Sequence, residues 1–433
     1  MRSAKNFRFP SLPSELVIKP DIYRGSALFD KPARLMYHAG AVFIIICFHL
    51  LISTVPAEVA IAAAASILGC LVSAFVLQKL SLYPGSPSLI LPISAVFLTH
   101  IPITIICFTF LSLSAFALFF NLLLVGIWLC IWYSAGCRLP VRIAVIPSTS
   151  SHALCSLHTK VATTWEYLNA PSQLTSVNVA WVARDQTTEL SAEWSKALAA
   201  RALQVISYAE AAEMVTGRVI RQFNSSNELE RVARKPFNRI GKRLFDLLIA
   251  LMAMPFLLLA IICAGTAIKF ESGGRIFFHQ KRMGHCQRVF TMLKFRSMFS
   301  IKDSGHQPGD CDHEQYITAV GRVIRKYHID ELPQVLNVLG GQMSLVGPRP
   351  EALELYYKYV SVIPEFRLRQ AVLPGLTGWA QVEQGYTNSV TGAACKSEYD
   401  LFYMKHFGFW LDLVIIIKTI GVILRKPFSH ASA

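Results

Sequence analysis

Two adjacent carboxylates, Asp330 and Glu331, are the residues of this sequence whose types and placement best suit chemistry. Pro333 and an amphipathic run follow them, which predicts that the pair opens a helix, because proline is well tolerated in a first turn. A helix N-terminus favours the ionised carboxylate. An ionised aspartate can attack phosphorus, and the neighbouring glutamate can hold a Mg²⁺ ion that offsets pyrophosphate charge. The alternative is that both acids only cap the helix or pair with nearby basic residues, which is the commoner role of such a pair taken alone.

Basic residues gather around the acidic pair in the sequence. Guanidinium groups bind phosphate through paired hydrogen bonds, which suits a diphosphate substrate better than a single ammonium group does. Any one of these residues taken alone is more often a solvated surface charge. The candidate phosphate-binding residues are Lys294, Arg296, Arg322, Arg325 and Arg349.

The bulk composition indicates which surroundings these residues need. The chain of 433 residues is 53% apolar and carries a formal net charge of +15. The apolar share points to a membrane, while the charge suits nucleic acid, anionic lipid or a phosphorylated substrate equally well. The sequence shows no nucleic-acid-binding module, so we expect no nucleic acid partner. Ten cysteines without a CxxC pair exclude the usual zinc patterns and predict free thiols.

Residues 37–135 are almost uncharged and predict four transmembrane helices, which follow a cytosolic tail at 1–36. Basic residues flank the region on both sides, and four crossings return the chain to its starting side, so both flanks are expected in the cytoplasm. The predicted crossings are 40–55, 58–77, 88–111 and 114–133.

Residues 136–235 predict a small α/β cytosolic domain of Rossmann-like type that ends in a polar, basic linker. Its first apolar run, RIAVIP, lacks the glycine fingerprint with which a backbone approaches a pyrophosphate. We therefore expect a scaffold, although whether the domain binds a ligand stays open.

The segment 241–269 is apolar enough to cross a membrane but contains Pro255 near its middle. Proline removes a helix hydrogen bond and crowds the preceding turn, so a kink is expected. Basic residues flank both ends, which predicts that both ends lie on the cytoplasmic side and that the helix is re-entrant. The alternative is an ordinary fifth crossing, which would place the basic C-terminal part outside the cell.

Six motifs in order give the C-terminal part of the chain a family resemblance. From Lys242 to about Leu424 the sequence resembles the bacterial sugar transferases, the polyprenyl-phosphate phosphoglycosyl transferases that begin exopolysaccharide assembly. The preceding membrane region and α/β unit resemble the large polytopic branch of that family. The motifs are KRLFD, KFRSM, IDELPQ, MSLVGPRP, PGLTGWAQV and YDLFY.

The resemblance implies a fold, a reaction and a location. It implies a monotopic, α-rich catalytic domain at 236–433 and an enzyme of the bacterial inner membrane whose catalytic domain faces the cytoplasm. Asp330 would attack a UDP-sugar, with UDP-glucose the first choice of donor. Undecaprenyl phosphate would then take the sugar phosphate. Glu331 would hold Mg²⁺, and Arg325 and Arg349 would bind phosphate.

Several alternatives remain beside this interpretation. UDP-galactose or a UDP-N-acetylhexosamine could be the donor, and the oligomeric state is open. A lipid or polysaccharide transporter is the main rival of another class. Two departures from the family pattern bear on details: Met254 precedes the kinking proline where serine is usual, and Leu373 precedes PGLTG where a basic residue is common.

Overall fold

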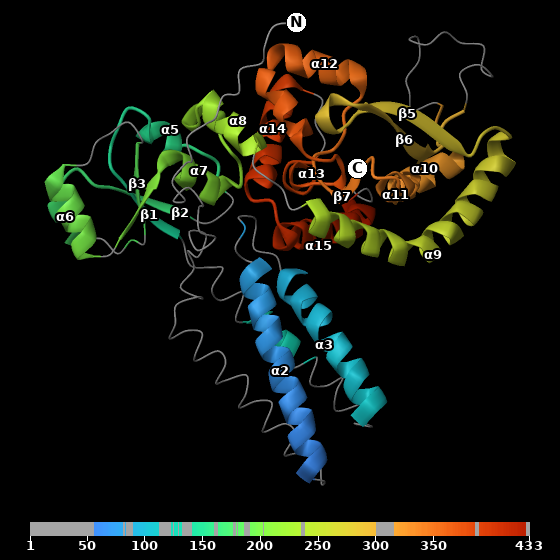
Figure 1. The fold of residues 1–433 in the computed structure, drawn as a ribbon, viewed down its shortest axis with the longest axis horizontal. Coiled ribbons are helices and arrows are strands. Elements are labelled where there is room, and N and C mark those ends of the chain that lie inside the picture. The colour runs from blue at the N-terminus through green and yellow to red at the C-terminus, as the bar shows by residue number, and fades with distance from the viewer. Residues whose placement is uncertain are drawn as a thin grey trace, which may run out of the picture.

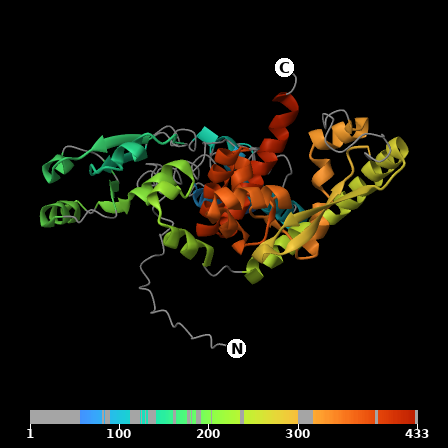
Figure 2. The same cartoon turned by 90° about the horizontal axis from the view of Figure 1, so that it is seen from above.

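The structure is a computed structural model that joins a helical pair, a small α/β domain and a larger C-terminal domain (Figure 1). Figure 2 shows the α/β domain lying beside the C-terminal domain rather than above it. The residues that the structure describes are 56–80, 83, 90–111, 123, 125–128, 130–131, 141–159, 163–175, 179, 181–185, 191–201, 203–234, 239–299, 316–385 and 389–429.

Helices α2 (Pro56–Leu80) and α3 (Ile90–Leu111) form the helical pair. They coincide with the second and third predicted crossings, and Pro102 lies within α3 without ending it. The hydroxyl groups of Ser73 and Thr99 join the two helices at 2.5 Å. The first predicted crossing and most of the fourth lie outside the described residues, so the count of four stays a prediction.

The predicted α/β domain is present and contains a parallel sheet. Its strands run in the order β2-β1-β3-β4, because alternating apolar strands and helices favour this parallel arrangement. Helix α7 begins with a capping box between Ser207 and Glu210 and ends at Gly217 in the left-handed region. The elements are β1 (Val141–Val145), α5 (Ser151–Cys155), β2 (Thr163–Tyr167), η4 (Pro171–Thr175), β3 (Trp181–Arg184), α6 (Ala192–Ala200), β4 (Gln204–Ser207) and α7 (Tyr208–Thr216).

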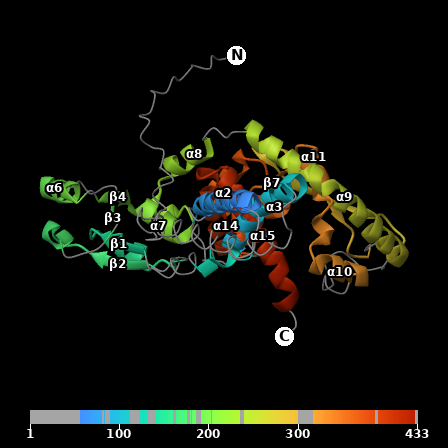
Figure 3. The same cartoon turned by 90° about the horizontal axis from the view of Figure 1, so that it is seen from below.

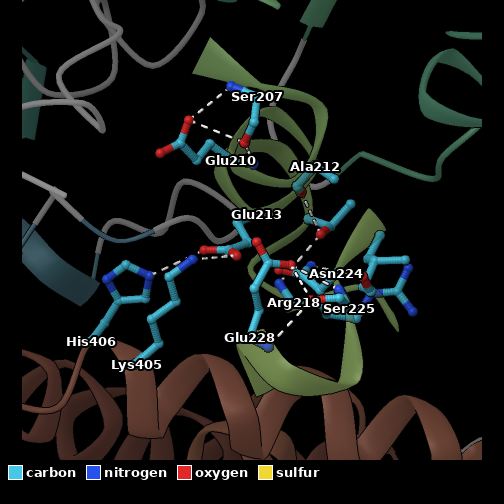
Figure 4. Close-up of polar contacts among 12 residues, drawn as sticks. Ser207, Glu210, Ala212, Glu213, Arg218, Asn224, Ser225, Glu228, Lys405 and His406 are labelled. Carbon is cyan, nitrogen blue, oxygen red and sulfur yellow. Dashed lines mark hydrogen bonds and ion pairs between the residues drawn. The ribbon is translucent and has the colours of Figure 1, made fainter. Parts of the chain in front are cut away.

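The segment expected to be a linker folds instead into η5 (Arg221–Phe223) and α8 (Ser226–Arg234). Ser225 and Glu228 make reciprocal hydrogen bonds at the start of α8, with the Ser225 amide donating to the Glu228 carboxylate at 2.8 Å (Figure 4). Leu229 is buried against the C-terminal domain. The expectation of a linker was wrong because polar composition alone concealed a capped helix with an apolar anchor.

The C-terminal domain is made of helices around two small sheets. Strands β5 and β6 form an antiparallel hairpin, and β7 and β8 pair in parallel. Its elements are α9 (Arg239–Ser272), β5 (Phe277–Met283), η6 (His285–Gln287), β6 (Val289–Phe295), α10 (Ala319–Lys326), η9 (Ile329–Glu331), α11 (Gln334–Leu339), β7 (Ser344–Val346), α12 (Leu353–Val362), η10 (Pro364–Ala371), β8 (Gly375–Thr377), α13 (Trp379–Glu383), α14 (Val390–Lys405) and α15 (Phe409–Ser429).

A buried carboxylate, Glu213 of α7, fastens the α/β domain to the C-terminal domain (Figure 4). It accepts a hydrogen bond from Lys405 Nζ at 2.7 Å and lies 3.4 Å from His406 Nε2. Burial by itself would raise the pKa of Glu213, but Lys405 and His406 outweigh burial and lower it. The carboxylate is therefore ionised and paired, and its removal would take away the buried charge that Lys405 and His406 contact.

We expect Glu213→Ala to destabilise the protein by about 3 kcal/mol, because it removes a buried carboxylate that pairs with Lys405 and His406 across the domain contact. The midpoint of thermal unfolding in detergent measures this effect. Glu193→Ala, which removes an exposed acid from α6, is the matched control and should leave the midpoint unchanged. Equal midpoints for the two variants would contradict the role given to Glu213.

Helix α9 is one continuous helix of 34 residues with Pro255 inside it. Figures 1 and 3 show it bowed along the face from which α2 and α3 project, and running across their direction. Among the residues that were searched, Ile240–Ser272 is the one helix long and apolar enough to cross a membrane. Its exposed apolar side chains include Leu244, Leu248, Leu251, Met252, Phe256, Leu259 and Ile262.

Helix α15 packs in the core along one side and is exposed along another. Leu411, Val414 and Ile415 are buried in the core, whereas Phe409 and Ile420 are exposed. The helix also contacts α2 and α3. It is therefore a core helix whose outer side meets the helical pair.

A buried polar cluster holds the start of α9 to the start of α15. Lys242 Nζ lies 3.2 Å from an oxygen of Asp246 and 2.8 Å from an oxygen of Asp412. Tyr403 donates its hydroxyl to Asp412 at 2.9 Å, and the amide of Leu345 in β7 donates to Asp246. Helix α9 is thereby fixed to the same strand that leads into the loop of Arg349.

Candidate active site

The acidic pair lies in a short 3-10 turn, η9, rather than at the start of a longer helix. Helix α10 ends where His328 adopts a left-handed conformation with φ of 55°. The turn then places Asp330 and Glu331 ahead of α11, whose first residue is Gln334. The sequence predicted that the acids open the helix. The helix α11 instead begins after them, at Gln334, and Pro333 is the residue that precedes it.

Glu331 is held by two cationic side chains from other elements. Lys294 of β6 donates to Glu331 Oε1 at 3.0 Å, and Arg349 binds both carboxylate oxygens, with Nη1 donating to Oε2 at 3.1 Å and Nη2 to Oε1. Burial would raise the pKa of Glu331, but the hydrogen bonds and charges of Arg349 and Lys294 lower it to about 2. Glu331 is therefore ionised at neutral pH and fixes both cations beside the turn.

Arg349 reaches the site from a rigid loop after β7, between Pro348 and Pro350. Its carbonyl oxygen accepts a hydrogen bond from Arg369 Nη2 at 2.8 Å. Burial would lower the pKa of Arg349, and the contact with Glu331 raises it instead. The guanidinium is thus a permanent positive charge of fixed position.

Asp330 differs from its neighbour because no hydrogen bond to its carboxylate exists within the described part of the chain. Burial raises the pKa of Asp330, and the charge of Glu331 adds to this, while Lys294, His328 and Arg325 act in the opposite direction. A partly buried carboxylate without donors keeps its lone pairs available. Asp330 is therefore suited to nucleophilic attack, and Glu331 is not.

Of the other predicted phosphate ligands, Arg325 lies near the turn η9, whereas Arg322 and Arg296 make no described contact with the acids. Arg325 is close enough to influence Asp330, and its Nε donates to Ser297 Oγ at 2.7 Å. Arg322 is exposed on α10. Arg296 turns away from the acids, because its Nη2 donates to the Ser272 carbonyl at 3.1 Å and so caps the end of α9.

Sequence reasoning missed two residues that shape the site. Ser297 orients Arg325, and its carbonyl accepts the amide of Thr318 at 3.2 Å, which fixes the start of α10. His328 supplies the left-handed turn before the acids. The KFRSM motif carried a signal for Ser297, whereas histidine at a left-handed position gives little sign in sequence.

The described side chains around the acidic pair do not form a clear site for the predicted Mg²⁺ ion. No cluster of three or more candidate ligands occurs among the described side chains that were searched. Both oxygens of Glu331 already accept hydrogen bonds from cations, so the carboxylate does not fit a metal ligand in this arrangement. The magnesium requirement stays a prediction.

We expect Glu331→Gln to slow formation of a sugar-phosphoryl enzyme about 100-fold, because Arg349 and Lys294 lose the anion that positions them. Single-turnover labelling with a radioactive donor measures the rate. The half-maximal magnesium concentration in the same assay then identifies the role, because a metal ligand predicts a higher requirement in the variant and a counter-ion an unchanged one. A labelling rate equal to that of the wild type would contradict both roles.

In this site Lys294 and Arg349 hold Glu331, while the neighbouring Asp330 carboxylate has no such donor, and the same domain carries a long, exposed apolar helix. These features indicate a membrane-associated enzyme that acts on a phosphate group. The family model described as bacterial sugar transferase matches residues 237–426. Over 302 residues the chain is 37% identical to a UDP-N-acetylgalactosamine-undecaprenyl-phosphate N-acetylgalactosaminephosphotransferase of Aeromonas hydrophila, covering 68% of this chain and 71% of that protein. The protein belongs to the bacterial sugar transferase family.

Two further relatives match less than half of this chain. Both are UDP-glucose:undecaprenyl-phosphate glucose-1-phosphate transferases. The protein from Xanthomonas campestris pv. campestris is 38% identical over 46% of this chain, and the one from Escherichia coli (strain K12) is 34% identical over 42%. The matches span 42% and 40% of the lengths of these two relatives.

Proposed function

We propose that this protein transfers a sugar 1-phosphate from a UDP-sugar to undecaprenyl phosphate, with Asp330 as the nucleophile. The observation that carries the proposal is the contrast within the acidic pair: Glu331 is bound by Arg349 and Lys294, while Asp330 has no such donor in the described structure. The family and the printed activities of the relatives support the same reaction.

The reaction takes two displacements at one phosphorus atom. In the first, an Asp330 oxygen bonds to the sugar-bearing phosphorus, and the bond from that phosphorus to the bridging oxygen breaks, so UMP leaves with that oxygen. In the second, an oxygen of undecaprenyl phosphate bonds to the same phosphorus and the Asp330 carboxylate leaves. Arg349, Lys294 and Arg325 would stabilise the charge on the phosphoryl oxygens.

The donor sugar is proposed only as a UDP-hexose. The relatives named for UDP-N-acetylgalactosamine and for UDP-glucose are 37% and 38% identical to this chain, so identity does not separate the two donors. A panel of UDP-sugars incubated with purified protein tests the proposal through release of UMP and retention of labelled sugar phosphate. A transporter would give neither product, and failure of every UDP-sugar would overturn the proposal.

We further propose that the enzyme sits in the bacterial inner membrane, with the acidic pair at its cytoplasmic face and α9 re-entrant. Helix α9, which carries many exposed apolar side chains, lies along the face from which α2 and α3 project (Figure 3), and this placement would bring lipid within reach of the domain. Exopolysaccharide assembly is the process that the family resemblance suggests.

We expect a tag that carries a cysteine and is fused after the last residue to be labelled only from the cytoplasmic side. A re-entrant α9 keeps both of its ends on that side. Labelling intact cells and inverted membrane vesicles with an impermeant reagent measures this. A tag placed before residue 37 is the control, since the same side is expected for it. Labelling of the C-terminal tag in intact cells would show that α9 crosses.

A further inference from the structure

A second arginine, Arg369 of η10, holds the loop that carries Arg349 and has no part in the reaction described so far. Arg369 is only 4% exposed. Its Nη2 donates to the carbonyl oxygen of Arg349, although the two residues lie 20 positions apart in the sequence. Arg349 is therefore held at two points, with Arg369 on its main chain and Glu331 on its guanidinium.

The guanidinium of Arg369 is itself fixed from several directions. Its Nη1 donates to Glu351 Oε1 at 3.2 Å, and its Nη2 lies 2.8 Å from an oxygen of Asp400 in α14. Its central carbon lies 4.6 Å from the centre of the Phe366 ring, a cation–π contact. A planar group held by two acids and an aromatic ring has one orientation, so its contact with the Arg349 carbonyl is well defined.

The buried charges around Arg369 form a balanced set of two bases and two acids. Lys396 of α14 is the second base, and it pairs with Glu351. Burial would raise the pKa of Glu351, but Arg369 and Lys396 lower it to about 2. Glu351 is therefore ionised at neutral pH. Moving one member of such a set would leave another charge buried and unpaired, so the set resists rearrangement.

Three successive carbonyl oxygens of the Arg349 loop each accept a hydrogen bond from a different element. Proline has no amide hydrogen, so a Pro-Arg-Pro segment lacks two of the donors with which a loop can hold its own shape. This loop depends instead on donors from outside it. The three contacts are the Gly375 amide to the Pro348 carbonyl at 3.0 Å, Arg369 Nη2 to the Arg349 carbonyl at 2.8 Å, and Arg282 Nη1 to the Pro350 carbonyl at 3.1 Å.

We propose that Arg369 is a positioning residue, which fixes the main chain of Arg349 so that the Arg349 guanidinium stays beside the acidic pair. The assignment rests on the proposed function, because it explains how a guanidinium expected to bind phosphate is held. Arg369 acts through Arg349 and not on the substrate. A side chain so deeply buried, whose hydrogen bonds go to Arg349 and Glu351, is closed to a ligand.

The expected effect of losing this contact is smaller than that of losing Arg349. A shift of about 1 Å in a group that positions a substrate can cost about 100-fold in rate. Without Arg369 the main chain of Arg349 is freed, but Glu331 still binds the guanidinium. We therefore expect Arg369→Gln to lower the labelling rate about tenfold at saturating donor.

A double variant separates positioning from a general loss of stability. In protein that already carries Arg349→Ala, Arg369→Gln should lower the single-turnover rate by less than about twofold, because the side chain that it positions is gone. Both rates are measured on the full-length protein in detergent, well below the thermal midpoint. Losses that multiply in the double variant would show that Arg369 acts independently of Arg349 and would overturn the proposal.

Hydrogen exchange followed by mass spectrometry tests the same contact without a substrate. Peptides that contain Gly347 and Gly375 should exchange about tenfold faster in Arg369→Gln, while peptides of α6 keep the rate of the wild type. Arg369→Lys keeps the buried charge but cannot reproduce the planar contacts, so an intermediate labelling rate is expected. If Arg369→Gln does not fold, Arg369→Lys carries both measurements.

Arg218→Gln is the matched control, because Arg218 lies 3.5 Å from Glu398 of the same helix α14 and serves the contact between the domains. It should lower the thermal midpoint and leave the labelling rate unchanged. A wild-type labelling rate in Arg369→Gln, with or without faster exchange, would overturn the positioning role. Wild-type protein that forms no sugar-phosphoryl adduct would instead overturn the proposed function, and hydrogen exchange would still show whether Arg369 holds the loop.

Discussion

Asp330→Asn is expected to abolish formation of the sugar-phosphoryl enzyme, with a fall in rate of at least about a thousandfold. The amide has nearly the same shape as the carboxylate but cannot attack phosphorus. Asp330 makes no hydrogen bond in the described structure, so its replacement should not disturb the fold. Mass spectrometry of protein incubated with donor alone measures the adduct directly.

Asp303→Asn is a matched control, because it makes the same change at an acid outside the acidic pair, and labelling should persist in it. Membrane insertion and the thermal midpoint should be the same for both variants and the wild type. Labelled Asp330→Asn protein would show that another residue is the nucleophile. Wild-type protein that turns over without any adduct would exclude the covalent route altogether.

Arg349→Ala is expected to reduce the labelling rate by about 100- to 1,000-fold, or about 3–4 kcal/mol, because it removes one member of a partly buried, hydrogen-bonded charge pair. The change removes one of the cations proposed to stabilise the phosphoryl oxygens and leaves Glu331 with Lys294 alone. Single-turnover labelling at saturating donor separates this effect from weaker donor binding.

Arg349→Lys should recover only part of the rate, because an ammonium group keeps the charge but cannot bind both oxygens of Glu331. Arg367→Ala is the matched control, since Arg367 is exposed and lies 3.8 Å from its acidic partner, Glu230. An Arg349→Ala rate within about threefold of the wild type would contradict a role for this guanidinium in the reaction.

Several features could be predicted from local sequence. The acidic pair and the small α/β domain follow from local residue patterns, and the family match confirms the class of enzyme. Arg296 shows where this reasoning fails. Its residue type fits phosphate binding, yet the end of α9 takes up its hydrogen bonds through Ser272, a residue 24 positions away.

The α8 segment failed for a related reason. Its polar composition indicates a linker. Leu229 is nevertheless buried, because η10 and α14 pack beside it in the folded protein. The apolar sequence of helix α9 is compatible both with lipid and with a protein core. The described fold exposes many of its apolar side chains and buries Ala250, Leu257, Ala264 and Ile268.

The sequence by itself determined which residue types are available for phosphate chemistry, because motif spacing and turn residues are properties of short segments. Tertiary structure alone decided which of the two adjacent carboxylates the cationic side chains hold. Lys294 and Arg349 approach from separate elements, 37 and 18 residues from Glu331, and both meet that carboxylate rather than Asp330. Hydrogen bonds depend on distance and direction in space, so no pattern along the chain reveals which of two adjacent carboxylates is left free.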